Sequence, residues 1–259
     1  MSPEASAAAG IGYACFVIAC VLYVLCLLKD DNYLGRLAMT TQTGGLLLWG
    51  AGWVWALVSS GDWPQLGAHD VLLWLVLVCV TASLLVERLH DMRVHSPWVL
   101  VLVLLLGGVV LFRAIPFRNP ATETLPAGGS MWTLAYGLLA VVGYGLLVVS
   151  GTLGIAELVR PVLDRRFLIY ASLSESDIER IVVALIHWAM LALTSALLLR
   201  VGWSWLATGM YWSWALVEVW MLVTWAVYGV YVHWGRFRQW PAAITSGMLL
   251  VGVALAPLM

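Results

Sequence analysis

The chain has 259 residues, of which 63% are hydrophobic and 10% are charged. A soluble domain is typically about half apolar and about a quarter charged, so this composition indicates an integral membrane protein in contact with lipid. The formal net charge of −1 argues against nucleic acid or a strongly acidic partner. The sequence contains no GxGxxG, P-loop or HExxH pattern, so it gives no support to soluble nucleotide chemistry. We predict a single transmembrane domain over residues 1–259.

The four cysteines all lie inside apolar runs: Cys15, Cys20, Cys26 and Cys79. None forms a CxxC or CxxCH pattern, so neither a zinc knuckle nor a covalently attached heme is indicated. We interpret them as small buried hydrophobic residues. The N-terminal MSPEASAAAG lacks Lys and Arg before the first apolar run, and we expect that run to be a retained anchor rather than a cleaved signal peptide.

Apolar runs of about 18 to 25 residues are typical of membrane-spanning helices, and eight candidate helices follow along the chain. The predicted fold is therefore an all-α bundle of about eight transmembrane helices. Their predicted bounds are Ile11–Leu28, Thr43–Ser59, Val71–Glu87, Pro97–Phe112, Ser130–Val159, Ile181–Leu199, Tyr211–His233 and Pro241–Leu258.

The basic residues between these helices predict the orientation in the membrane. The odd-numbered loops hold ten of the 13 Lys and Arg residues and the even-numbered loops hold three. Because cytoplasmic loops are enriched in Lys and Arg, we predict that both termini lie outside and that the odd-numbered loops are cytoplasmic. The stretch Trp203–Trp214 then lies at the outer surface, and His233 lies at the inner end of its helix.

The most unusual stretch runs from Trp203 to His233 and surrounds one carboxylate, Glu218, with tryptophans. Aromatic residues favour the membrane interface, which accounts for many tryptophans but not for the deeper Trp220 and Trp225. A carboxylate and a histidine on a membrane helix are costly and are functional candidates. On a continuous helix, one face would hold Tyr211, Trp214, Glu218, Met221, Trp225 and Tyr228. That face either packs against other helices or binds a ligand.

The same stretch resembles the tryptophan-rich WWD signature of the cytochrome c assembly family, heme-handling membrane proteins of the CcsA, CcmC and HemX types. The matching positions are Trp212, Trp214, Glu218, Trp220, Leu222, Thr224, Trp225, Tyr228, Tyr231 and His233. Weaker similarity covers Ser60–Pro64 and Met131–Gly137, so the resemblance extends over most of the chain.

The resemblance implies that the outer WWD surface cradles heme and that the histidine ending this helix ligates a heme b inside the membrane. Candidate cofactor-binding residues are then Trp212, Trp214, Glu218, Trp220, Trp225, His187 and His233. We expect His233 to ligate the heme iron, with His187 on the preceding antiparallel helix as its partner. The structural alternative is a His187 that is hydrogen-bonded to a neighbouring helix and a His233 that reaches the inner surface. His90 and His95 are further alternatives.

Three departures from the family pattern bear on function. The family's Asp-Pro-Lys is Ala215-Leu216-Val217 here, Gly128-Gly129 occupy the region where an external histidine is expected, and no late external histidine precedes Met259. Asp62 and His69 in an outer loop are candidate replacements, although we expect His69 to be solvated.

The sequence therefore supports two hypotheses. The first is a heme-handling protein of cytochrome c maturation in a bacterial-type inner membrane, which holds heme for transfer to an apocytochrome or another cytochrome c partner without classical catalysis. The alternative is a heme-binding or structural membrane subunit of a larger respiratory electron-transfer complex. A transporter has only Glu218 and the Gly-rich second helix in its favour. In every case a buried Glu218 must be hydrogen-bonded or paired. Tryptophan N–H groups and tyrosine hydroxyls are the expected donors, and any cation must come from another helix, with Arg113 or Arg200 as candidates. We expect Glu218→Gln to be tolerated if Glu218 serves hydrogen bonding alone.

Overall fold

A computed structural model describes residues 3–29, 31–60, 68–90, 93, 95–112, 131–163 and 175–235. All the regular secondary structure within these ranges is helical. The helices are α1 (Pro3–Lys29), α2 (Asn32–Ser60), α3 (Ala68–His90), α4 (Ser96–Phe112), α5 (Met131–Leu163), α7 (Glu175–Thr208) and α8 (Leu216–Val230), followed by the short π-helix η2 (Tyr231–Gly235).

The predicted all-α membrane architecture is confirmed, but the count of eight spans is not. Among the described residues, four segments are long and apolar enough to cross a membrane, within α1, α3, α5 and α7. A shorter apolar helix, Ser96–Leu111, lies in α4. The predicted last helix, Pro241–Leu258, lies outside the described residues.

The second helix begins earlier than its apolar run suggests. It starts at Asn32 rather than at Thr43, and its threonine hydroxyls bond to carbonyls within the helix. Thr41 donates to the carbonyl of Leu37, and Thr43 does the same to the carbonyl four residues before it, both at 2.8 Å. Such bonds remove the cost of placing threonine hydroxyls in an apolar setting.

The seventh predicted helix, Tyr211–His233, is wrong over its first turn. The preceding helix α7 continues to Thr208, the chain then turns at Gly209, and α8 begins only at Leu216. Gly209 has a φ of 73°, a left-handed conformation that glycine adopts without a steric penalty. The tryptophan-rich stretch is therefore a helix end, a turn and a helix start.

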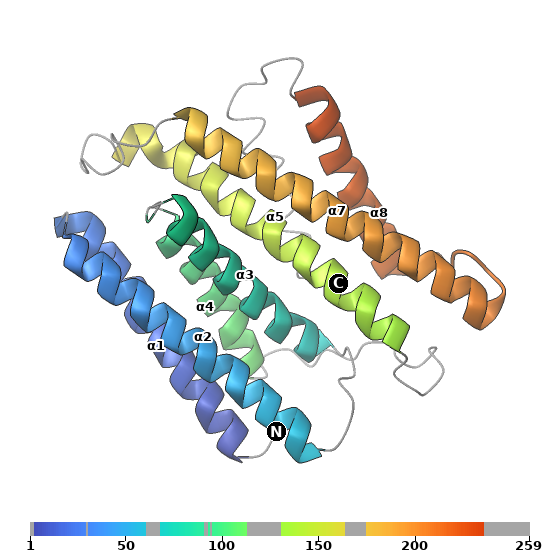
Figure 1. Cartoon of the computed structure of the whole chain (residues 1–259), viewed down its shortest axis with the longest axis horizontal. Coiled ribbons are helices and arrows are strands. Elements are labelled where there is room, and N and C mark those ends of the chain that lie inside the picture. Colours follow the sequence, from blue (N-terminus) through green and yellow to red (C-terminus); the bar gives the residue numbers. More distant parts are fainter. Residues whose placement is uncertain are drawn as a thin grey trace.

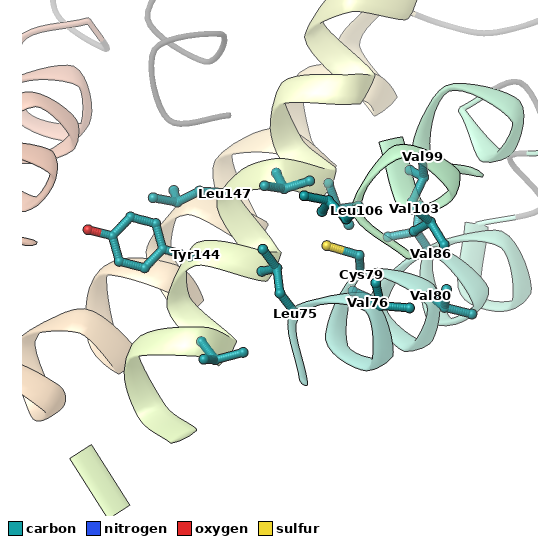
Figure 2. Packing of buried hydrophobic residues seen from close by; sticks show 14 of the residues in the cluster. Leu75, Val76, Cys79, Val80, Val86, Val99, Val103, Leu106, Tyr144 and Leu147 are labelled. Carbon is teal, nitrogen blue, oxygen red and sulfur yellow. The ribbon is translucent and has the colours of Figure 1, made fainter. Parts of the chain in front are cut away.

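The helices pack as neighbouring antiparallel pairs (Figure 1). Helices α1 and α2 form a hairpin, α3 lies between α4 and α5, α7 packs along α5, and α8 branches from α7. Figure 2 shows α3 contributing Leu75, Val76, Cys79, Val80 and Val86 to the core, with α4 and α5 on either side. Glycine permits a close approach of α5 to α3, because a Cβ on Gly145 would clash with the side chain of Val78.

One buried carboxylate ties several helices together at the end of the bundle where α1 and α3 end. Glu87 is 2% exposed and accepts hydrogen bonds from the hydroxyls of Tyr23 and Ser96. Arg93 Nε lies 3.7 Å from its other oxygen, and Arg93 also donates to Asn32 at 3.0 Å. The cluster of Tyr23, Asn32, Glu87, Arg93 and Ser96, named the Glu87 cluster below, thus links α1, α2, α3 and α4.

Candidate functional site

At the opposite end of the bundle, a second buried carboxylate joins α7 to α8. Glu218 is 2% exposed, and Arg200 of α7 places Nε and Nη2 each 2.8 Å from its Oε1. The Arg200 guanidinium also lies over the ring of Tyr136 on α5, 5.3 Å from the ring centroid. Arg200 was one of the two cations expected to pair with Glu218; Arg113 lies outside the described residues. A charge at this depth needs such a partner.

The same carboxylate organises the turn that precedes its helix. Ser213 donates from its hydroxyl to Oε1 at 2.8 Å and from its backbone N–H to Oε2 at 3.0 Å. The backbone N–H of Ala215, the residue that caps α8, donates to Oε2 at 3.3 Å. Glu218 thus supplies one half of a capping box, and alanine has no side-chain oxygen to supply the other half.

Trp214, between these two donors, has a strained backbone and an exposed side chain. Its φ is 57° and its side chain is 76% exposed. The left-handed conformation costs a residue with a Cβ about 1–2 kcal/mol, and such strain persists where its surroundings hold it in place. Glu218 bonds the backbone on both sides of Trp214, so the buried ion pair holds this tryptophan outward.

Other aromatic side chains extend this exposed surface. Trp205 and Tyr211 stack with ring centroids 4.4 Å apart and planes 9° apart, and Trp212 meets Trp214 edge to face at 6.3 Å. Among the described residues, the buried indole nitrogen of Trp212 has no hydrogen-bond partner. We call Trp205, Tyr211, Trp212 and Trp214 the aromatic turn.

The aromatic residues deeper in α8 serve mainly for packing. Met221 and Tyr228 are buried, and the Trp225 indole nitrogen donates to Thr194 of α7 at 2.8 Å. Trp220 is half-buried. The prediction that Tyr211 and Trp214 share one helical face with these residues is wrong, because both residues precede the start of α8.

The donors to Glu218 also differ from expectation. Tryptophan N–H groups and tyrosine hydroxyls were expected, whereas the described donors are Arg200, Ser213 and the Ala215 backbone. Ser213 was missed by sequence reasoning, although a serine five residues before a buried carboxylate at a helix start was a usable signal.

His187 and His233 both carry an exposed imidazole whose Nδ1 bonds a carbonyl of its own helix. The distances are 2.7 Å to Val183 O and 2.9 Å to Gly229 O. Because a carbonyl only accepts, each Nδ1 carries the proton, and a neutral ring leaves Nε2 with a free lone pair. No hydrogen bond or ring contact joins these two imidazoles in the described chain. The alternative that His187 bonds a neighbouring helix is wrong, since its partner lies on α7.

The remaining histidine candidates differ in their surroundings. His95 is 1% exposed, with Nε2 3.3 Å from Ser83 Oγ, and His90 is exposed at the end of α3. The structure describes neither Asp62 nor the side chain of His69. Within the described ranges, no group of three or more His, Cys, Asp or Glu side chains could hold a metal ion, so a bare metal centre is not indicated there. A heme needs only one or two axial ligands, and a His Nε2 is a common one.

The fold and site thus define an all-helical integral membrane protein with an exposed aromatic turn above a buried ion pair. A family model, "Cytochrome C assembly protein", matches residues 66–259. The chain belongs to that family.

Curated relatives and a solved structure agree with this assignment. "Cytochrome c biogenesis protein CcsA" of Chlamydomonas reinhardtii is 24% identical over 212 residues, which cover 74% of this chain and 57% of that protein. The CcsA of Prochlorococcus marinus (strain MIT 9313) is 25% identical over 225 residues, which cover 76% and 71%. "Cytochrome c Heme Lyase CcmF" superposes with a TM-score of 0.74 at 18% identity, covering 99% of this chain. The chain spans 46% of CcmF and 57% of the Chlamydomonas protein, so it is similar to a part of each.

Proposed function

We propose that this protein handles heme in cytochrome c maturation, binding it at the aromatic turn for delivery to an apocytochrome. The observation that carries this proposal is the exposed, left-handed Trp214 held by the buried Arg200–Glu218 pair. Binding sites are where backbone strain and exposed aromatic surface are typically retained. The family membership and the CcsA and CcmF names support heme as the cargo.

In this proposal Trp212, Trp214 and Trp220 contact the porphyrin by stacking, an interaction suited to large flat rings. Among the described residues the buried indole N–H of Trp212 has no acceptor, and in this proposal a bound heme supplies one. Glu218 and Arg200 are positioning residues: they fix the turn and do not touch heme. The aromatic turn is an exposed surface rather than an enclosed pocket, which suits a site that passes its ligand on.

We further propose that His233 ligates the iron of a resident heme b, with His187 as the intrachain candidate for the second ligand. Both side chains fit the role chemically, because each Nδ1 donates to a backbone carbonyl, which leaves Nε2 as the nitrogen that would face a metal. His233 lies on a π-helical turn, a feature that often marks functional positions. When bound, a heme of this kind supplies an iron that exchanges one electron.

The outer site is tested by Trp214→Ala, with Trp55→Ala as the matched control. Both tryptophans are largely exposed, Trp214 at 76% and Trp55 at 52%, but Trp55 lies on α2, away from the turn. We expect Trp214→Ala to lower the heme that copurifies with the protein several-fold and Trp55→Ala to leave it unchanged. The measurement is heme per protein from the optical spectrum of the purified variants. Equal heme content in the two variants would contradict the proposal.

The inner site is tested by His233→Ala and His187→Ala. We expect His233→Ala to abolish the low-spin b-type absorption, and His187→Ala to convert it to a high-spin spectrum if His187 is the second ligand. Full low-spin heme in His233→Ala rules out the inner site. An unchanged spectrum in His187→Ala moves the second ligand to another residue or another chain.

One observation favours a second candidate function, a heme-binding or structural subunit of a respiratory electron-transfer complex. The described histidine side chains are His90, His95, His187 and His233, and none of them lies at the aromatic turn. Among the described side chains the turn has no axial ligand nearby, which suits a subunit better than a delivery factor. Purification of the native protein with stoichiometric electron-transfer subunits would favour this candidate, whereas recovery with an apocytochrome would favour maturation.

A further inference from the structure

A groove with a volume of about 750 Å³ runs between α3, α5 and α7 and is unrelated to the aromatic turn. Its lining comes from α5, with Val142 and Leu146, and from α3 and α7. Figure 1 shows that α5 lies between α3 and α7. Leu89 of α3 and Trp188 of α7 line it and are 73% and 64% exposed. The lining is almost wholly apolar, so its natural occupant is an apolar chain.

The groove has a polar end. Its lining includes His90 and Arg180, and these lie at the same end of the bundle because α3 finishes where α7 begins (Figure 1). Ser195 lies toward the other end of the groove. Arg180 and Ser195 are fifteen residues apart on α7, which at about 1.5 Å per residue is about 22 Å. One leaflet of the hydrocarbon core is about 15 Å thick, half of about 30 Å, so the groove is long enough for an acyl chain.

The charge within the lining favours an anion, because Arg180 is the one Lys, Arg, Asp or Glu among the described residues that line the groove. The Arg180 side chain is 81% exposed and its described ion pair is with Asp177, at 3.8 Å one turn away on the same helix. An exposed pair of this kind contributes little, so the guanidinium remains available to a phosphate, which it binds with its planar fork. His90 is the polar neighbour of Arg180 in the lining, whereas the exposed side chains of Arg88, Asp177 and Glu179 lie outside it.

We propose that the α3–α5–α7 groove binds an anionic glycerophospholipid. One acyl chain lies along Leu85, Val142 and Leu191, and the phosphate pairs with Arg180 beside His90. An apolar transmembrane helix of a partner protein would supply no anion to pair with Arg180. The charge pattern therefore favours a lipid over a helix.

The test compares lipid retention by native mass spectrometry of the protein in detergent with added phosphatidylglycerol or phosphatidylcholine. We expect the native chain to retain phosphatidylglycerol several-fold more than phosphatidylcholine, and Arg180→Gln to remove this preference. Arg88→Gln is the matched control, because Arg88 is an exposed arginine at the same end that does not line the groove. Ala184→Phe, which fills the groove, should lower retention of both lipids. Monodisperse elution and native helicity establish that each variant is folded.

Three outcomes would overturn the proposal. They are equal retention of the two lipids by the native chain, loss of the preference in Arg88→Gln as well as in Arg180→Gln, and unchanged retention in Ala184→Phe. A photo-crosslinker at Leu191 in native membranes distinguishes a bound lipid from a bound partner helix. Attachment to lipid supports the proposal, and a discrete adduct with a second polypeptide identifies a partner helix and rejects it.

Discussion

At the scale of single residues, Glu218 makes the contacts that hold the site in place. Its two oxygens accept from Arg200, from Ser213 twice and from the Ala215 backbone. A fully buried carboxylate is rare unless it is paired, and here the pairing also fixes the backbone on both sides of Trp214. The N-terminus of α8 adds a favourable dipole, because Glu218 lies in the first turn. One side chain therefore links a membrane charge to an exposed aromatic ring.

Glu218→Gln is expected to destabilise the protein by about 3 kcal/mol, because it leaves the largely buried Arg200 cation without a counter-charge. A tolerated substitution was expected only if Glu218 served hydrogen bonding alone, and the Arg200 pair argues against that. The measurement is denaturant unfolding in mixed micelles. Glu179→Gln, on the exposed start of α7, is the control and should change the free energy of unfolding by less than about 0.5 kcal/mol.

A double-mutant cycle separates charge pairing from general disruption. If Arg200→Gln combined with Glu218→Gln is less destabilised than the sum of the single variants, the two residues are coupled. Additive losses would mean that the ion pair has no energetic role. The outcome also bears on heme binding, since the turn that presents Trp214 depends on the same contacts.

At the scale of helices, small residues set how closely the hairpins pack. A Cβ on Gly12 of α1 would lie 2.9 Å from the backbone nitrogen of Trp49 and 3.0 Å from the carbonyl oxygen of Gly45, both on α2. Backbone atoms cannot rotate away as a flexible side chain can. Close helix approach through glycine is a common mode of packing in membranes. Gly12 therefore lets α1 and α2 approach closely.

Gly12→Ala is expected to destabilise the protein by about 1–3 kcal/mol, the usual range for overpacking. Gly10→Ala, two residues earlier on the same helix, is the matched control, because nothing lies within 4 Å of its Cβ position. That variant should be neutral or slightly stabilising, since alanine is the better helix former. Thermal unfolding in detergent measures both. Equal behaviour of the two variants would show that α1 and α2 do not pack as described.

At the scale of the whole molecule, the bundle has two buried carboxylates at opposite ends. The Glu87 cluster links α1 to α4, and the Glu218 pair links α7 and α8 with α5 through Tyr136. Tyr144 of α5 adds a bond to Thr224 of α8 at 3.3 Å, and its hydroxyl points away from the α3 core in Figure 2. Polar contacts thus specify which helices pair, where apolar packing alone would not.

Hydrophobic runs predicted most of these helices because a membrane span needs length and apolar content, and those are visible in sequence. They failed where apolar residues form a turn. Tyr211, Trp212 and Trp214 were assigned to a helix by composition, but Gly209 and Ser213 redirect the chain. The Glu87 cluster was also missed, because its partners are up to 64 residues apart and no local pattern joins Tyr23 to Glu87. Arg200 was foreseeable since a buried carboxylate requires a cation.

The orientation in the membrane is the property that decides which compartment each carboxylate faces. Basic residues cluster around the end that holds Arg88, Arg93 and Arg180, and ten of the 13 Lys and Arg residues lie in the loops assigned to it. Retention of positive loops on the cytoplasmic side predicts that the Glu87 cluster faces the cytoplasm and the aromatic turn faces outward. Only that orientation lets the aromatic turn meet an exported apocytochrome.

Single cysteines at His90 and Thr208 test this orientation in intact cells. His90 and Thr208 are exposed at opposite ends of the bundle, and the native cysteines, which are buried or half-buried, are replaced by alanine. We expect Thr208→Cys to react with a membrane-impermeant maleimide from outside and His90→Cys to react only after permeabilisation. The reverse pattern would place the aromatic turn in the cytoplasm and remove the physical basis for heme delivery outside. Each site is the control for the other. If the membrane leaks, the maleimide labels both cysteines without permeabilisation.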